Sequence, residues 1–281
     1  MSIEIVTTGA AAGAEIRGVD LSRPLDDAAF AAIRKAFDEH GVVFFRDQKI
    51  KPADHVAFTR RFGELEFNHN SKKFGFDGIP ELYVLSNITE NGKPLGVRGA
   101  GGRWHSDMCY AARPAYATML YAVEVPVLNG LTLGDTEFAN AAAAWDALPE
   151  AMQHSLEGRK AVFDFRGRKR TRPIDEATIA EYPPVQHPIV RRHPRTGRKS
   201  LYAMRDDCTG IVGMEEDAGR SLIAALADHI IRPEFVYRHR WRKGDFLMWD
   251  NCTVQHRAVI DYDLPQRRHM WRTTIKGEPP Q

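Results

Sequence analysis

Trp104-His105-Ser106-Asp107 follows a glycine-rich approach, Gly99-Ala100-Gly101-Gly102-Arg103. In an extended chain residues i and i+2 point to the same side, so one metal ion can contact both the His105 imidazole and the Asp107 carboxylate. A second imidazole would complete a face of two histidines and one carboxylate, a ligand set that suits non-haem Fe(II) oxygenases. The best candidate is His256, which ends the stretch Trp249-Asp250-Asn251-Cys252-Thr253-Val254-Gln255-His256. A His-x-Asp pair alone is a weak signal, so the rest of the chain has to support it.

Composition indicates an ordinary globular protein. The chain has 281 residues, of which 43% are hydrophobic and 27% charged, and its net charge is +2. This length suits one large β-rich domain over residues 1–281. A nearly neutral charge gives no drive toward nucleic acid, and the basic run Arg166–Arg172 has no interleaved aromatic residues and is interpreted as a solvated loop. We therefore expect no nucleic-acid partner.

Two features indicate a cytoplasmic location. No stretch approaches the ~20 apolar residues of a spanning helix, and Met1-Ser2-Ile3-Glu4-Ile5 lacks the basic and apolar regions of a signal peptide. The three cysteines, Cys109, Cys208 and Cys252, are odd in number and far apart, which argues against a disulfide framework or a thiolate zinc site. We expect a soluble protein in a reducing compartment, which would keep iron ferrous, and no membrane partner.

The pattern of apolar residues predicts several helices. Asp26 or Asp27 can cap a helix with Phe30, Ile33 and Phe37 on one face, and Gly41 is its expected end. A second helix opens at Pro52, and others are expected near 140, over 149–157 and over 215–231.

Strands are expected between these helices, at irregular intervals. Apolar runs and alternating patterns predict them at 3–21 (two strands), 42–45, 81–88, 116–125, 160–165, 188–193, 200–204, 235–241 and 246–249. Irregular spacing argues against a doubly wound parallel sheet and favours a mostly β double-stranded β-helix, or jelly roll, with flanking helices. Residues 66–80 and 129–136 are expected to be loops, and 66–80, 94–103 and 166–186 are expected to act as lids over the site.

Two arginines follow His256 at an even spacing. Arg268 and Arg272 are four positions apart, so on a strand both would face the mouth of a barrel. A guanidinium is well suited to gripping a carboxylate through two parallel hydrogen bonds. Two arginines near a metal therefore indicate anionic ligands.

At this point the chain resembles the family of taurine and aryloxyalkanoate dioxygenases. The resemblance extends over nearly the whole sequence, and the segments that carry it are Gly13-Ala14-Glu15-Ile16-Arg17-Gly18-Val19-Asp20-Leu21, Arg61-Phe62-Gly63-Glu64-Leu65, Trp104-His105-Ser106-Asp107, Gly134-Asp135-Thr136, Thr196-Gly197-Arg198-Lys199, Trp249-Asp250-Asn251, His256 and Arg268–Arg272. His105 and His256 are 256−105, or 151, positions apart and Arg268 follows 12 later, which fits the family's order and spacing.

The resemblance implies a Fe(II)- and 2-oxoglutarate-dependent dioxygenase that uses O2 and releases succinate and CO2. It implies that the metal ligands and catalytic residues are His105, Asp107 and His256, and that Thr136 and Arg268 bind 2-oxoglutarate. Because Asp107 is a carboxylate, no coordination place is left for chloride, and hydroxylation is expected over halogenation. Relatives of this kind are commonly dimers or tetramers, so a homo-oligomer is expected.

The resemblance also implies a small anionic organic substrate, with Arg272 as its clamp. In taurine-specific members a histidine in the loop after Phe-Gly-Glu-Leu and an asparagine before Trp-His hold taurine. Here the matching loop position is Asn68, with His69 beside it, and Gly101-Gly102-Arg103 precedes Trp104. An aryloxyalkanoate or related carboxylate, or another sulfonate, is therefore expected in place of taurine.

Three alternatives stay open from the sequence. The first is a taurine dioxygenase proper. The second is a non-catalytic jelly-roll module that binds a ligand in the same pocket. The third is a structural zinc protein, which is disfavoured because closed zinc sites use four ligands and only three cluster here.

Overall fold

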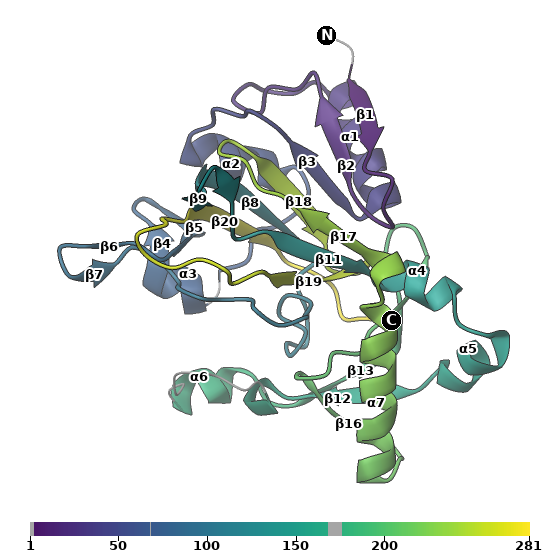
Figure 1. The fold of residues 1–281 in the computed structure, drawn as a ribbon. Helices are drawn as coiled ribbons and strands as arrows, with labels where there is room; N and C mark the ends of the chain where they lie inside the picture. Colours follow the sequence, from purple (N-terminus) through teal and green to yellow (C-terminus); the bar gives the residue numbers. More distant parts are fainter. Residues whose placement is uncertain (1–2, 68, 168–175) are drawn as a thin grey trace.

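The structure is a computed structural model that describes residues 3–67, 69–167 and 176–281. Its main feature is an eight-stranded sheet (Figure 1). In spatial order the strands are β1 (Glu4–Thr7), β2 (Ala14–Arg17), β3 (Val42–Phe45), β18 (Phe246–Asp250), β8 (Ala117–Glu124), β20 (His269–Ile275), β5 (Ile79–Ser86) and β4 (Gly75–Phe76). Its strand pairs are antiparallel apart from β2 and β3. Strands from both ends of the chain thus lie side by side at its centre.

A smaller three-stranded sheet packs against one face of the large one. Its order is β17 (Val236–His239), β11 (Thr136–Asn140) and β19 (Val254–Ala258). Alternation along β18 explains the packing, since side chains of a strand point to opposite faces. Leu247 and Trp249 join Phe138 of β11 in the core between the sheets. Phe246 and Met248 join the core on the other face.

Two helices cover that other face. They are α1 (Asp27–His40) and α2 (Pro52–Arg60), and α1 buries Ile33 and Phe37 in the second core. The Asp26 carboxylate accepts a hydrogen bond from the backbone N–H of Ala29, which caps the start of α1. Gly41 ends it with φ +67°, a conformation that glycine adopts without strain. The predicted helix is therefore confirmed at both ends.

A third layer lies below the sheets in Figure 1. It contains the sheet β13 (Val185–Pro188), β12 (Lys160–Phe163) and β16 (Cys208–Ile211) and the helix α7 (Glu216–Ile230). The helix α4 (Ala141–Asp146), which follows β11, and the hairpin β14 (Val190–Arg192) and β15 (Lys199–Leu201) share its apolar core. The remaining elements are α3 (His69–Phe74), α5 (Glu150–Leu156), α6 (Glu176–Glu181), η1 (Phe165–Gly167), η2 (Pro233–Phe235), β6 (Thr89–Glu90), β7 (Lys93–Pro94), β9 (Val127–Leu128) and β10 (Leu131–Thr132).

Two face-to-face sheets with flanking helices form the predicted jelly roll. Several boundaries differ from the prediction. The segment 66–80 is not a plain loop, because it contains α3, β4 and the start of β5. The segment 129–136 contains β10 and the first residue of β11. Strands were also missed at β11 and β19, which carry Thr136 and His256, whereas the strand considered for Arg268 and Arg272 corresponds to β20, which begins at His269.

Two of the three expected lid segments, 66–80 and 166–186, contain regular structure, whereas 94–103 is largely irregular. In 166–186 the chain forms part of η1, the helix α6 and the start of β13, while residues 168–175, which include most of the basic run, lie outside the described residues. In 94–103 only Pro94, at the end of β7, and an isolated bridge at Val97 are regular. None of the helices in the described ranges has the length and apolar character needed to span a membrane.

Candidate active site

The two predicted histidine ligands are neighbours in the backbone. The N–H of His105 donates to the carbonyl of His256 at 3.0 Å, and the N–H of His256 donates to the carbonyl of His105 at 2.8 Å. His256 lies in β19, where Phe138 of β11 is its partner in register. Asp107 follows in a turn. Segments 151 positions apart are thereby held together by main-chain hydrogen bonds, which do not depend on side-chain identity.

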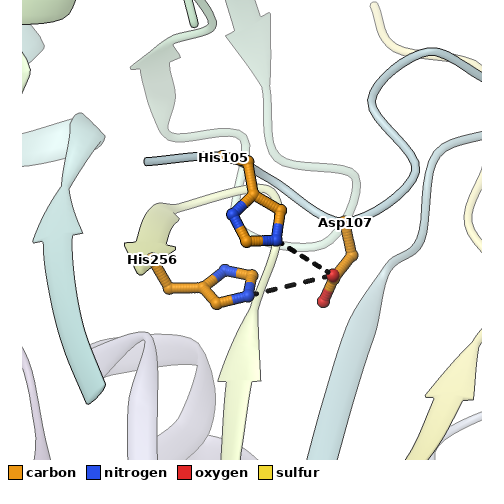
Figure 2. Close-up of side chains that lie close together, drawn as sticks. All are labelled: His105, Asp107 and His256. Carbon is orange, nitrogen blue, oxygen red and sulfur yellow. Dashed lines mark ion pairs between the residues drawn. The ribbon is translucent and has the colours of Figure 1, made fainter. Parts of the chain in front are cut away.

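The three side chains converge on one point (Figure 2). Oδ1 of Asp107 lies 3.7 Å from Nε2 of His105 and 3.8 Å from Nε2 of His256. Nδ1 of His105 lies 2.7 Å from the carbonyl oxygen of Arg103, so this nitrogen carries the proton and Nε2 presents its lone pair. Two imidazole nitrogens and one carboxylate oxygen therefore face a common centre.

The Asp107 carboxylate is ionised despite its burial. Burial alone would raise the pKa of Asp107, but the charge of Arg272 and its hydrogen bond hold this pKa well below its usual range. Nη2 of Arg272 donates to Oδ1 of Asp107 at 2.6 Å. The carboxylate is thus in the anionic form that a metal ligand requires.

These residues open into a pocket with about 960 Å3 of empty space, part of which is open to solvent. Its wall includes backbone and side chains from α3, β5, β8, β11, β18 and β19. The lining residues are Asn70, Tyr83, Leu85, Ala100, Gly101, His105, Asp107, Met108, Tyr110, Leu120, Thr136, Phe165, Trp249, His256, Ala258, Arg268 and Arg272. The pocket therefore combines polar groups at the triad with an aromatic and aliphatic wall.

Arg268 and Thr136 lie in the same pocket. Arg268 is 7% exposed, and its Nε finds no hydrogen-bond partner among the described residues. Burial lowers the pKa of Arg268, while Tyr262 opposes this shift. Oγ1 of Thr136 accepts a hydrogen bond from the indole N–H of Trp241 at 3.0 Å, which leaves the hydroxyl proton of Thr136 available to a ligand. The buried guanidinium of Arg268 and the hydroxyl of Thr136 can thus both donate hydrogen bonds to an anion in the pocket.

Arg272 is the second cation of the pocket, and 13% of its side chain is exposed. Beyond its contact with Asp107, its Nε also makes no hydrogen bond within the described part of the chain. Burial would lower the pKa of Arg272, but Asp107 raises it, so the guanidinium stays charged. An uncompensated buried donor is costly, and an anionic ligand would satisfy it.

Two predicted substrate contacts cannot be placed. Asn68 and the side chain of His69 lie outside the described residues, although the backbone of His69 begins α3. Their neighbour Asn70 lines the pocket. The other predicted residues, His105, Asp107, His256, Thr136, Arg268 and Arg272, are brought together at one pocket.

Sequence reasoning missed several residues of the site. Tyr110 and Phe165 line the pocket, and their ring centroids lie 4.5 Å apart. Tyr182, which follows α6, lies 5.0 Å from Tyr110 and 5.1 Å from Phe165. Thr118 touches Asp107. Each of these residues reads as core packing in sequence, and only the fold brings Tyr110 and Phe165 to the pocket wall, Tyr182 to their rings and Thr118 to Asp107.

The jelly roll and its His–Asp–His face define the class of non-haem iron oxygenases, whose ligand set is two imidazoles and one carboxylate with open coordination positions. Residues 5–274 match the family described as "Taurine catabolism dioxygenase TauD, TfdA family", and the chain belongs to this family.

Individual relatives agree with this membership. The chain is 37% identical to an alpha-ketoglutarate-dependent 2,4-dichlorophenoxyacetate dioxygenase of Cupriavidus pinatubonensis, with 93% of each chain covered. It is 33% identical to an alpha-ketoglutarate-dependent sulfate ester dioxygenase of Pseudomonas putida, covering 95% of this chain and 87% of that one. The crystal structure of AAD-2 with Mn(II) and N-oxalylglycine matches with a TM-score of 0.84 at 32% identity, covering 100% of this chain and 98% of that one.

Proposed function

We propose that this protein is a Fe(II)- and 2-oxoglutarate-dependent dioxygenase that hydroxylates a small anionic organic substrate. The observation that carries the proposal is the convergence of two imidazoles, one ionised carboxylate and two buried arginines on a single pocket. The fit to the metal and co-substrate is chemical. The donor set suits Fe(II), and the unmatched Nε atoms of Arg268 and Arg272 suit two anionic groups.

In this proposal His105, Asp107 and His256 hold Fe(II). When bound, iron with 2-oxoglutarate and O2 supplies the oxidation that converts a substrate C–H to C–OH, while 2-oxoglutarate becomes succinate and CO2. The protein residues bind, orient and exclude water. Trp249 packs against the His256 ring, with centroids 4.6 Å apart, and shields this ligand from solvent.

Arg268 and Thr136 are assigned to the distal carboxylate of 2-oxoglutarate. The guanidinium of Arg268 can donate two parallel hydrogen bonds, and the Thr136 hydroxyl can add a third. Trp241 supports this assignment. Its N–H donates to a lone pair of Thr136, so the hydroxyl proton of Thr136 points away from Trp241 and can be donated to a ligand. A buried cation that forms no ion pair with a carboxylate in the described part of the chain is explained by a ligand that brings one.

Arg272 is assigned to the anionic group of the substrate. We expect an aryloxyalkanoate or related carboxylate, or a sulfonate, because Tyr83, Tyr110 and Phe165 line the same pocket as this cation and supply aromatic surface for an apolar body. Asn68 and His69 are proposed as further contacts, supported by the position of Asn70 in the pocket wall.

Two alternatives are less well supported. Taurine is small and has no apolar body to fill the aromatic wall, and the 37% identical relative is named for 2,4-dichlorophenoxyacetate. A non-catalytic binding module would have no need of an intact triad, because the arginines alone can hold an anion.

We also propose a single catalytic domain whose segments 66–80, 94–103 and 166–186 close over the substrate. Supporting this, pocket residues range from Asn70 to Arg272, and Asn70 and Ala100 belong to the first two of these segments and line the pocket. A cytoplasmic homo-oligomer, dimer or tetramer, completes the proposal. The three cysteines are free thiols in the structure, which suits a reducing compartment.

The test is succinate release from 2-oxoglutarate in the presence of Fe(II), O2 and a panel of aryloxyacetates, aryloxypropionates, sulfonates, sulfate esters and aliphatic carboxylates. We expect one class to stimulate succinate formation and to yield a hydroxylated product or its fragments. The Asp107→Ala protein should lose this turnover. Full turnover in that variant would overturn the assignment, and an absent visible absorbance for the anaerobic Fe(II)–2-oxoglutarate complex would favour the binding module.

A further inference from the structure

The two oxygens of the Asp107 carboxylate lie in different surroundings. Oδ1 faces His105 and His256 and accepts a hydrogen bond from Arg272. Oδ2 accepts a hydrogen bond from the hydroxyl of Thr118 at 2.6 Å. Thr118 lies in β8 and is fully buried, so no water competes for this bond. One oxygen is therefore directed to the metal centre, and the other is held by the protein.

The direction of the Thr118 hydrogen bond is fixed by its other neighbour. Nδ2 of Asn251 lies 3.2 Å from Oγ1 of Thr118. The Asn251 amide cannot be turned over, because its Oδ1 accepts from two groups that only donate, the backbone N–H of Asp107 at 3.1 Å and the indole N–H of Trp249 at 3.2 Å. Nδ2 must therefore donate to Thr118. A hydroxyl has one hydrogen, and that of Thr118 is left for Asp107.

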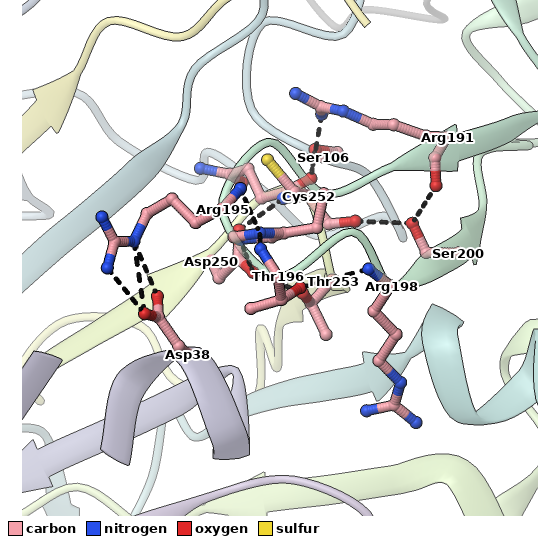
Figure 3. A network of polar contacts seen from close by, with 12 residues as sticks. Asp38, Ser106, Arg191, Arg195, Thr196, Arg198, Ser200, Asp250, Cys252 and Thr253 are labelled. Atoms are coloured by element: carbon pink, nitrogen blue, oxygen red, sulfur yellow. Dashed lines mark hydrogen bonds and ion pairs between the residues drawn. The ribbon is translucent and has the colours of Figure 1, made fainter. Parts of the chain in front are cut away.

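The backbone of Asn251 is held in turn from the other side. Ser106 donates through its hydroxyl to the Asn251 carbonyl at 2.9 Å, and Nη1 of Arg191 lies 3.4 Å from the same oxygen. Figure 3 shows the polar network around this turn. Arg191 reaches it from β14, and Ser106 comes from the segment that also carries His105 and Asp107. The amide that orients Thr118 thus has little freedom of its own.

We propose that Thr118 is a positioning residue that makes Asp107 present one oxygen, and only one, to the metal. The inference rests on the proposed function. The torsion that turns a carboxylate is soft, so without the Thr118 hydrogen bond Oδ2 can swing toward the metal as well. A second oxygen would then occupy a position that 2-oxoglutarate or O2 requires. Partners that orient metal ligands in this way typically change affinity or activity by about 10–100-fold.

The test compares three variants at Thr118. Thr118→Val keeps the shape and removes the hydrogen bond, Thr118→Ser keeps the hydroxyl, and Thr118→Cys keeps a weak donor. Thr273→Val is the matched control, since Thr273 is also fully buried in the large sheet but pairs with His55 and Thr59, away from the triad. Circular dichroism checks that each protein is folded. Mn(II) binding to each is measured by electron paramagnetic resonance, and the Kd of 2-oxoglutarate for the anaerobic Fe(II) protein by visible absorbance.

We expect all four proteins to bind Mn(II) stoichiometrically. The Kd of 2-oxoglutarate should rise about tenfold or more in Thr118→Val and by less in Thr118→Cys, while Thr118→Ser and Thr273→Val stay within about twofold of wild type. An unchanged Kd in Thr118→Val would overturn the inference alone, and so would an equal rise in Thr273→Val. If Thr118→Val does not fold, the Kd of 2-oxoglutarate in Thr118→Cys is the deciding measurement, and an unchanged value there would overturn the inference. No visible absorbance in the wild-type protein would overturn the inference and the proposed function together.

Discussion

Arg268 and Arg272 lie four positions apart in the chain, and their surroundings in the pocket differ. Among the residues that the structure describes, Nε of Arg268 has no hydrogen-bond partner, whereas Arg272 contacts the Asp107 carboxylate. The difference matters because a buried charge without a partner is destabilising until a ligand of opposite charge binds. A charge that is already paired within the protein also stabilises the fold. A substitution at Arg268 should therefore affect mainly ligand binding, and one at Arg272 should also affect stability.

Arg268→Met should weaken 2-oxoglutarate binding with little effect on folding. Truncating one side of a buried charge pair costs about 2–5 kcal/mol, so the Kd of 2-oxoglutarate should rise by about 30-fold or more. Visible absorbance of the anaerobic Fe(II) protein measures it. Arg267→Met is the control, since Arg267 is half exposed and pairs with Glu124 at the surface. An unchanged Kd in Arg268→Met would remove Arg268 from the co-substrate site.

Arg272→Gln should destabilise the metal-free protein. Without Arg272 the Asp107 charge stays buried with no cation, and breaking such a pair costs about 3–5 kcal/mol. Saturating Mn(II) supplies the missing positive charge and should restore most of this loss. Urea unfolding with and without Mn(II) measures both effects, again with Arg267→Gln for comparison. Equal losses in both conditions would show that Arg272 acts through packing and not through charge.

At the scale of single elements, α2 contains a buried histidine that makes folding sensitive to acid. His55 is fully buried, and burial lowers its pKa to about 3 from the ordinary 6.5. Its Nε2 pairs with the hydroxyl of Thr273 in β20, 2.9 Å away. Between pH 6.5 and 3 the unfolded chain binds a proton at His55 that the folded chain does not, so the free energy of unfolding falls as the pH falls.

His55→Gln removes this titration and keeps a hydrogen-bonding side chain. One proton contributes about 1.4 kcal/mol per pH unit, so from pH 7 to pH 5 the wild-type protein should lose about 2 kcal/mol more than the variant. Urea unfolding at the two pH values measures the difference. His40→Gln, at the partly exposed end of α1, should keep the wild-type slope. The same slope in His55→Gln would show that His55 is protonated in the folded protein.

Elements with local signals could be predicted, and those held by distant partners could not. The helix α1 is marked by Asp26 and Gly41 at its ends and by an apolar face between them. By contrast, α3 has six residues, too few for a period. In β19, Gln255, His256 and Arg257 give no apolar alternation, because function and not packing decides these residues. The strand becomes visible only through its pairing with β11.

The same distinction divides the residues of the site. The metal face was predictable because His105, Asp107 and His256 belong to motifs with a characteristic order. Thr118 was not, since a threonine inside an apolar strand is a common β-branched packing residue. Its role follows only from the fold that sets it against Asp107.

At the scale of the whole molecule, ligand binding should stabilise the folded chain, because the pocket residues extend from Asn70 to Arg272. A ligand at 100 times its Kd adds about 2.7 kcal/mol, which for a chain of this size corresponds to a rise in Tm of about 5 °C or more. We expect this rise with Mn(II) and 2-oxoglutarate together and its reversal by a chelator. Thermal unfolding measures it, and Asp107→Ala should show no Mn(II)-dependent shift. A similar shift in that variant would place the metal elsewhere.

The backbone hydrogen bonds between His105 and His256 also bear on how the protein acquires its metal during synthesis. They close a loop of 151 residues, and contacts of such long range form late, after the entropy of closing the loop has been overcome by other packing. When only the first half of the chain has emerged from the ribosome, His105 and Asp107 are exposed but His256 has not yet been synthesised. The nascent protein is therefore a poor chelator, and iron loading belongs to the finished fold.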